Sequence, residues 1–268
     1  MNPNSLIGRI MQRLEREGVP NFYGEQRFGY RLNNHELGRL LLLGEWQAFL
    51  DRMLGEPRDG DSPPARAARE SYERGDYAAA IEQWPTVHRF ERQAVGPLSR
   101  GAPPADAVNG IDTTQRFLLI SAFQSAIFNR VLDRRLRDGL FATMLEGDVA
   151  FGHADRSFHP VTDLADAQRR YEAHEISPTG PVWGRRMRRA RGEVDQWEKQ
   201  ALAEAGLEEQ SLQEGDYQPD GNRRALRMLL TDAHTSAGAD EHGPYICIGF
   251  QLPRGCFATT VMRELMKH

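Results

Sequence analysis

Five arginines fall within a seven-residue stretch of this chain, and arginine is the side chain best suited to hold phosphate. They are Arg185, Arg186, Arg188, Arg189 and Arg191. A guanidinium donates two parallel hydrogen bonds to a phosphate, whereas a lysine ammonium acts as a point charge. A second group consists of Arg130, Arg134, Arg135 and Arg137. Both groups are typical of an RNA-binding surface, and both also suit a solvated helix face paired with glutamates.

The overall charge does not by itself indicate a broadly basic nucleic-acid binder. Lys and Arg number 34 against 38 Asp and Glu, which gives a net charge of −4. Only Lys199 and Lys267 are lysines, so 32 of the 34 basic residues are arginines. A GC-rich genome accounts for most of that bias. The RNA-binding hypothesis therefore depends on the two local clusters, not on average composition.

Several familiar catalytic patterns are missing from the sequence. The histidines form neither H-x-x-x-H nor H-E-x-x-H spacing, and His153 and His159 stand around a predicted loop as surface polar residues do. There is no P-loop, no G-x-G-x-x-G after a predicted strand and no G-x-S-x-G elbow. The two cysteines, Cys247 and Cys256, are too few for a four-cysteine zinc site or a disulfide framework. We therefore expect no metal, and hydrolase, kinase and dinucleotide-dependent activities have no support.

Composition predicts a folded chain in a reducing cytoplasm. Charged residues make up 27% of the 268 and hydrophobic residues 40%, with a mean hydropathy of −0.61. No apolar run approaches the ~20 residues that cross a bilayer. The first residues lack a basic start followed by a long apolar stretch, so we expect no secretory signal.

The apolar periodicity predicts a mostly helical chain. Helices are expected over residues 5–17, 36–54 with a break near Gly44, 65–84 around Gly75, 114–137, 163–174, 192–214, 222–230 and 256–266. The strongest is 114–137, whose expected buried face starts at Phe117. Short strands are expected within 147–161, and 18–29, 55–64, 95–110 and 176–184 are predicted loops.

The clearest strand candidate lies near the C-terminus. Tyr245–Leu252 (YICIGFQL) is an almost continuous apolar run of strand length, which predicts a central buried strand. A single central strand needs partners, and the rest of the chain offers few. A mostly helical chain with one strong strand candidate is therefore an unusual combination.

Four segments carry specific sequence motifs in a specific order. They are GVPNFYGEQRFG (18–29), SAFQSAIFNRVLDRRLRDG (121–139), EISPTGPVWG (175–184) and FQLPRGCFATTVMREL (250–265). Together they closely resemble the tRNA pseudouridine synthase D (TruD) family, over the whole length of the chain. The resemblance implies an enzyme that isomerises uridine-13 of tRNA to pseudouridine without metal or organic cofactor.

The resemblance also implies a fold and a domain plan. The fold class is α+β: a largely helical insertion domain of the TruD type together with an incomplete mixed α/β pseudouridine synthase catalytic domain. Residues 20–230 would be the insertion, and residues 1–19 and 231–268 would be pieces of the catalytic domain. The strand at Tyr245–Leu252 would then belong to a sheet whose other strands lie elsewhere.

One expected feature of the family has no match in this sequence. The nucleophilic aspartate of the family lies in a G-x-K-D segment well before the GVPNFYGEQRFG segment. Only 17 residues precede Gly18 here, and no Lys-Asp pair occurs. We therefore assign no catalytic residue and expect a fragment that is inactive alone, through truncation, a misplaced gene start or a split gene. Asp148, in EGDVAF, is expected to lie in a turn instead.

The family resemblance assigns a role to Phe257, and the loop position or the charge of other residues suggests further roles. Phe257 would stack on the uracil, and its place at the start of a helix after a strand and a turn suits a ligand site. Asn21, Gln26 and Arg27 would border the substrate, or would brace a structural hinge. The Arg185–Arg191 cluster would contact the tRNA backbone, and Arg254 and Arg263 could also face RNA.

A second function class stays open. The segment RGDYAAAIEQWP (74–85) resembles half of a tetratricopeptide repeat, but no second copy follows, and stacked repeats are needed for stability. The alternative is an RNA-binding or helical protein-interaction module without catalysis. We expect tRNA as the partner and a monomer when the protein is complete, although the sequence leaves the oligomeric state and the RNA features open.

Overall fold

The computed structural model describes residues 3–253 and 256–266, so Arg254 lies outside the described residues. The chain divides into two compact units. The first, called the sheet unit here, comprises Met1–Gly24, Ile127–Ala205 and Asp220–His268. The second, the helical unit, comprises Glu25–Ala126 and Gly206–Pro219. Helices and antiparallel strands together make the α+β class that the sequence predicts.

The helical unit is built from short helices and one 3₁₀ turn. Its elements are η1 (Glu25–Phe28), α2 (Asn34–Leu43), α3 (Trp46–Leu54), α4 (Pro63–Glu73), α5 (Tyr77–Gln83), α6 (Arg89–Ser99), α7 (Pro104–Asn109), the first part of α8 (Thr113–Arg137) and α11 (Ser211–Glu214). Gly44 separates α2 from α3 in the left-handed conformation (φ 70°), which glycine adopts without steric cost. Asp76 caps α5 by accepting the Ala79 N–H at 3.0 Å. These breaks lie where the sequence predicts them.

One helix prediction fails in this unit. Phe117 does not start a buried face of α8: its side chain is 50% exposed and meets the Tyr217 ring edge-on at 6.4 Å. Further along α8, Ile120 and Phe123 are buried as expected. A single aromatic at the outer end of an amphipathic stripe has fewer neighbours to cover it.

The sheet unit contains all of the described strands. Its elements are α1 (Pro3–Glu17), β1 (Val19–Pro20), the end of α8, β2 (Val149–Gly152), β3 (Phe158–Pro160), α9 (Leu164–Glu172), β4 (Ile176–Val182), α10 (Gly192–Glu204), β5 (Asn222–Ala225), β6 (Arg227–Met228), β7 (Thr231–Asp240), β8 (Gly243–Gln251) and α12 (Ala258–Met266). The largest described sheet has the order β3-β2-β4-β5, with every neighbour antiparallel. No described helix combines the length and apolar composition needed to cross a membrane.

The pairing of β1 with β6 brings distant parts of the chain together. Val19 lies opposite Met228, and the Asn21 N–H donates to the Leu226 carbonyl at 2.9 Å. The roughly 200 intervening residues therefore leave and return at one point. An insertion into a pre-existing domain needs this arrangement, and the division into 1–19, 20–230 and 231–268 stays a prediction.

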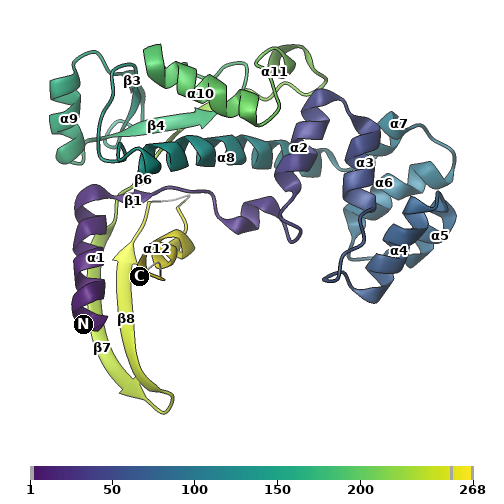
Figure 1. The fold of residues 1–268 in the computed structure, drawn as a ribbon, viewed down its shortest axis with the longest axis horizontal. Coiled ribbons are helices and arrows are strands. Elements are labelled where there is room, and N and C mark those ends of the chain that lie inside the picture. Colours follow the sequence, from purple (N-terminus) through teal and green to yellow (C-terminus); the bar gives the residue numbers. More distant parts are fainter. Residues whose placement is uncertain (1–2, 254–255, 267–268) are drawn as a thin grey trace. The chain divides into compact units, whose positions relative to one another are not determined.

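The β7–β8 hairpin packs with the two terminal helices. In Figure 1, α1 runs beside the hairpin and α12 lies near its other strand. The shared core contains Met11, Leu14, Met228, Val261 and Leu265, all less than 9% exposed. The chain ends of the sheet unit thus share one hydrophobic cluster.

The β8 strand exists, but it is not the buried central strand that its apolar run predicts. None of its residues is buried, and Tyr245 is 48% exposed. Within the described residues, β8 pairs with β7 alone. Ile248 and Phe250 pack against the core from one face of β8. No described layer of side chains covers the opposite face of the strand.

Three other segments differ from their predictions. Residues 95–110 are not a loop throughout, because α6 continues to Ser99 and α7 spans Pro104–Asn109. Residues 176–184 form β4, a buried strand, instead of a loop. Its Pro178 joins the ladder through the carbonyl oxygen, which accepts the Leu226 N–H at 2.9 Å, so the missing proline N–H costs nothing there. Residues 222–230 form β5 and β6 instead of a helix. The apolar Leu226, Met228 and Leu230 recur at every second position, which is a strand period. The buried Arg227 between them donates to the Tyr171 and Ile176 carbonyls.

Candidate functional site

Asn21 is the most tightly fixed of the predicted substrate residues. Its side-chain Nδ2 donates to the Ala225 carbonyl at 2.8 Å, and its Oδ1 accepts from Arg224 Nη2 at 2.6 Å. Because a guanidinium only donates and a carbonyl only accepts, these two partners fix which amide atom faces which way. Among the described residues, the second Nδ2 hydrogen has no acceptor. Asn21 is 5% exposed, so this amide is held still at the edge of the protein interior.

Arg224 ties Asn21 to two aromatic rings. Its guanidinium carbon lies 4.3 Å from the centre of the Tyr23 ring and 5.8 Å from that of Phe128. Tyr23 meets Phe128 edge-on, with ring centroids 5.4 Å apart. A cation over an aromatic face contributes about 0.5–2 kcal/mol, more as water is excluded. Arg224 was not singled out from the sequence, because it lies in none of the four family segments.

A backbone clasp holds the same loop on α8. The Tyr23 N–H donates to Asn129 Oδ1 at 2.9 Å, and Asn129 Nδ2 donates back to the Tyr23 carbonyl at 2.9 Å. Asn129 thereby acts as a peptide-like partner for residue 23. Tyr23 and Asn129 each lie in one of the family segments, so the sequence marked both residues. A single sequence does not show that the two segments pair with each other.

The other two segments meet the same cluster. A Cβ added to Gly180 of β4 would lie 2.9 Å from Leu226 and 3.0 Å from the Phe128 ring, so only glycine leaves room for that ring. Cys256 Sγ lies 3.9 Å from Asn21 Oδ1. Burial raises the pKa of the Cys256 thiol, so at neutral pH it stays protonated and acts as the weak donor of this contact.

Phe257 follows directly after that contact. It is 42% exposed and precedes α12, and its carbonyl accepts the Thr260 N–H at 3.0 Å. The α12 side chains Val261 and Leu265 are buried. The helix is therefore anchored by its apolar face while the Phe257 ring keeps an exposed surface. Phe257 is not a core residue of the described structure, and its stacking role remains a prediction.

Gln26 and Arg27 lie in the other compact unit. Both belong to the 3₁₀ turn η1, with Gln26 exposed and Arg27 half-buried. The Arg27 carbonyl accepts from Asn34 Nδ2 at 3.5 Å. The structure therefore brings Asn21 and Phe257 into one unit. That Gln26 and Arg27 border the same substrate remains a prediction.

The Arg185–Arg191 cluster is partly engaged by its own protein. Arg185 and Arg186 lie 3.2 and 3.6 Å from Asp220, and Arg189 pairs with Asp195 at 2.6 Å. Arg188 and Arg191 are exposed, and neither has a side-chain hydrogen bond or ion pair within the described structure. Two of the five guanidiniums are thus immediately available to a phosphate.

The second cluster fits the alternative of a paired helix face. Arg130 lies 4.0 Å from Glu204, Arg134 lies 3.6 Å from Asp138, and Arg137 lies 2.8 Å from Asp133. Arg135 is buried, and its guanidinium pairs with Asp148. Asp148 is therefore a structural ion-pair partner shielded from solvent, not a carboxylate open to substrate.

The histidines do not form a relay. Both Ser157 Oγ and Asp155 Oδ2 face the same ring nitrogen, Nε2 of the exposed His159, at 2.6 and 2.7 Å. A catalytic triad needs one partner on each ring nitrogen. His153 is half-buried and bonds Ser177 Oγ at 2.8 Å. Among the described residues, no three His, Cys, Asp or Glu side chains are placed to share a metal ion.

Comparisons with known proteins indicate the same family as the four segments. The family model described as "tRNA pseudouridine synthase D (TruD)" matches residues 2–265. The tRNA pseudouridine synthase D of Geobacter metallireducens is 40% identical over 260 residues, covering 96% of this chain and 63% of that protein. The Geobacter sulfurreducens protein is 38% identical, covering 96% and 62%. The chain therefore spans somewhat less than two thirds of these relatives.

A solved structure shows a similar fold. The putative tRNA pseudouridine synthase D (TruD) of Methanosarcina mazei superposes with a TM-score of 0.88 at 23% identity. The match covers 99% of this chain and 65% of that one. At this identity the comparison supports the fold alone.

Proposed function

Because the chain belongs to the tRNA pseudouridine synthase D (TruD) family, we propose that it acts in the isomerisation of uridine-13 of tRNA to pseudouridine. The Asn21–Arg224–Cys256 contacts support this proposal most directly. They fix a hydrogen-bonding amide beside the residue that precedes an exposed phenylalanine. A planar base with polar edges needs these two elements, an aromatic face and an oriented amide.

The reaction is an exchange of bonds within one nucleoside. The bond between uracil N1 and ribose C1′ breaks, the base turns, and a bond forms between C5 and C1′. The C5 proton leaves, and N1 gains a proton, so atoms and electrons balance without a redox partner or a co-substrate. We infer that no cofactor takes part, as the family resemblance implies.

The residues present would bind and hold the base. Extruding a base from its stack costs a few kcal/mol, and stacking on an aromatic side chain returns about 1–3 kcal/mol. Phe257 would provide that face, and the remaining Asn21 Nδ2 hydrogen would donate to a uracil carbonyl. Gln26 and Arg27 would also border the substrate. The acid of the family is not assigned to any of these residues, because no Lys-Asp pair occurs in the sequence.

Arg188 and Arg191 would make the first contacts with the tRNA backbone, with Arg185, Arg186 and Arg189 joining as they exchange acidic partners for phosphates. Each phosphate contact releases bound counterions, so affinity should fall steeply as salt rises. A protein of this kind works where tRNA matures, so we place it in the cytoplasm.

The test is release of tritium from tRNA labelled at uracil C5, because each isomerisation frees that hydrogen. The 268-residue chain is assayed alone and joined to the part of the Geobacter metallireducens relative that it does not cover. We expect release from the joined protein only. Turnover by the chain alone would refute the inference about the acid. Tight tRNA binding without turnover by the joined protein would instead favour an RNA-binding module.

A further inference from the structure

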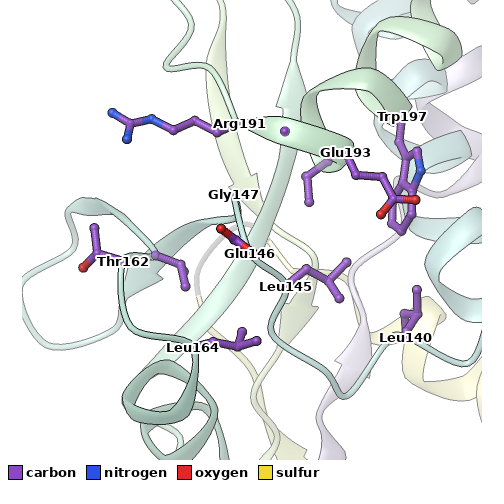
Figure 2. Close-up of a pocket in the computed structure, with 12 residues that line it drawn as sticks. Leu140, Leu145, Glu146, Gly147, Thr162, Leu164, Arg191, Glu193 and Trp197 are labelled. Carbon is purple, nitrogen blue, oxygen red and sulfur yellow. The ribbon is translucent and has the colours of Figure 1, made fainter.

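A pocket of about 820 Å³ opens in the sheet unit, and neither Asn21 nor Phe257 lines it. It lies among the loop after α8, the segment before α9 and the start of α10 (Figure 2). Pockets of this size hold small ligands or single nucleotides. Its lining includes Leu145, Glu146, Gly147, Arg191, Glu193 and Trp197.

Buried contacts hold one wall of this pocket in place. The Leu145 N–H donates to Asp148 Oδ2 at 2.8 Å, and Asp148 pairs with the buried Arg135. The Arg191 N–H donates to the Gly147 carbonyl at 2.9 Å, which ties the loop to the start of α10. Glu146 is thus held between two anchored neighbours.

A second buried ion pair anchors the facing wall. Glu198 of α10 receives two hydrogen bonds from Arg223 of β5, at 2.7 and 2.9 Å, and both side chains are at most 1% exposed. Buried pairs of this kind add little net stability but restrict the arrangements that the chain can adopt. Trp197, the preceding residue, is therefore carried on a fixed helix. The pocket is formed before any ligand arrives.

The pocket combines an apolar floor with an unpaired polar rim. Trp197 presents an aromatic ring, over which the Arg134 guanidinium lies at 4.5 Å. Glu146, Glu193 and Arg191 are exposed, and within the described structure none has a side-chain hydrogen bond or ion pair. In Figure 2, Glu193 lies beside the Trp197 ring, Glu146 sits on the facing loop, and Arg191 extends outward.

This chemistry selects among ligands. Two carboxylates and one guanidinium line the pocket, and a second guanidinium, that of Arg134, lies over the Trp197 ring. The two carboxylates favour a group rich in hydrogen-bond donors. Guanine presents two adjacent donors, N1–H and the N2 amine, to one carboxylate, whereas adenine presents only its N6 amine. A basic protein segment would also suit the carboxylates, but Arg191 and the exposed Arg188 beside it would repel it. The same arginines would attract the phosphate of a nucleotide.

We propose that this pocket binds an unstacked guanine nucleotide of the RNA substrate, apart from the site of the modified uridine. Trp197 packs against the base, Glu146 and Glu193 accept its edge donors, and Arg191 holds the adjoining phosphate. The proposal rests on RNA being the substrate, but it uses none of the residues of the Asn21–Phe257 site.

The test is quenching of tryptophan fluorescence in the 268-residue chain by guanosine, inosine and adenosine 5′-monophosphates. A bidentate contact to a base discriminates by about tenfold or more, so we expect GMP to bind about tenfold tighter than AMP, with IMP between them. Glu146→Gln with Glu193→Gln should remove that preference. Arg191→Gln should weaken GMP but not guanosine, and Trp197→Phe should abolish the quenching.

A matched control is Glu82→Gln, an exposed glutamate on α5 outside the pocket, which should leave the preference unchanged. Equal affinities for GMP and AMP would overturn the proposal, as would a preference that survives the double substitution. Saturable binding of N-acetylarginine amide without GMP binding would overturn it too, and would assign the pocket to a basic protein partner. None of these outcomes depends on uridine isomerisation, so the two proposals fail separately.

Discussion

Arg223 and Arg224 are neighbours on β5, yet their side chains have different surroundings. Strand alternation sends them to opposite faces. Arg223 enters the interior and forms a two-pronged ion pair with Glu198, with both side chains at most 1% exposed. Arg224 packs over Tyr23 and donates to Asn21. One arginine fixes the framework between sheet and helix, and the other fixes a polar group that can meet a substrate.

Buried ion pairs and partly buried polar contacts lie in different places in the sheet unit. Fully buried pairs, Arg223–Glu198 and Arg135–Asp148, lie behind the walls of the pocket. The partly buried Arg224 contacts lie where the family segments converge. The charged groups of the interior pairs are dehydrated and held in a fixed geometry. The Asn21 amide, in contrast, has one N–H without an acceptor among the described residues. Framework and site can therefore be separated by substitution.

The largest effect should come from breaking a buried pair. Arg223→Ala leaves the Glu198 carboxylate buried without a partner, which costs about 3–5 kcal/mol of unfolding free energy. Urea unfolding measures it. Replacing both partners, Arg223→Met with Glu198→Leu, should recover most of the loss because no charge then stays buried. A cost below about 1 kcal/mol for Arg223→Ala would show that the pair does not hold α10.

A smaller effect is expected on the other face of the strand. Arg224→Ala removes a charged hydrogen bond and a cation–π contact, together about 1–3 kcal/mol. A double-mutant cycle with Asn21→Ala should show coupling of about 0.5 kcal/mol or more. Arg263→Ala, an exposed arginine on α12, is the control and should change unfolding by less than about 0.5 kcal/mol. Additive Arg224 and Asn21 changes would mean that Arg224 does not orient the amide.

The smallest effect concerns an exposed acid. Hydrogen bonds from the Ser157 hydroxyl and N–H, with His159 nearby, lower the pKa of Asp155 to about 2. Because the folded pKa lies below the ordinary value, this contribution to stability is present above pH 4 and is lost as the pH falls toward 2. Carboxyl NMR should give a midpoint near 2, and Asp155→Asn should weaken the acid dependence slightly. A midpoint near 3.8 would contradict the contacts.

Helices were largely predictable from the sequence, because their signals are local. The break at Gly44, the Asp163 cap of α9 and the end of α8 before Gly139 each follow from residue type and spacing. β4 was not predictable, since its prolines indicate a loop until the neighbouring strands supply donors for their carbonyls. The burial of β8 was overestimated, because an apolar run does not reveal how many layers cover it.

The site was predictable only in part. Asn21 and Phe257 came from the family resemblance, and the structure places Asn21 against Cys256, next to Phe257. Arg224 and the Glu198 anchor depend on contacts between residues far apart in sequence, so no local pattern marks them. The pocket is also assembled from three separate segments, of which only Arg191 had been singled out.

We expect Phe257 to serve the substrate and not the fold. The direct measurement is tritium release by the joined protein carrying Phe257→Ala, alongside its urea unfolding, with Tyr245→Ala as an exposed aromatic control on β8. We expect uridine conversion to fall about 10- to 100-fold, the equivalent of one lost stacking contact, while unfolding changes by less than about 1 kcal/mol. Conversion that falls only in proportion to stability, or equally in the Tyr245 variant, would show that Phe257 does not act on the substrate.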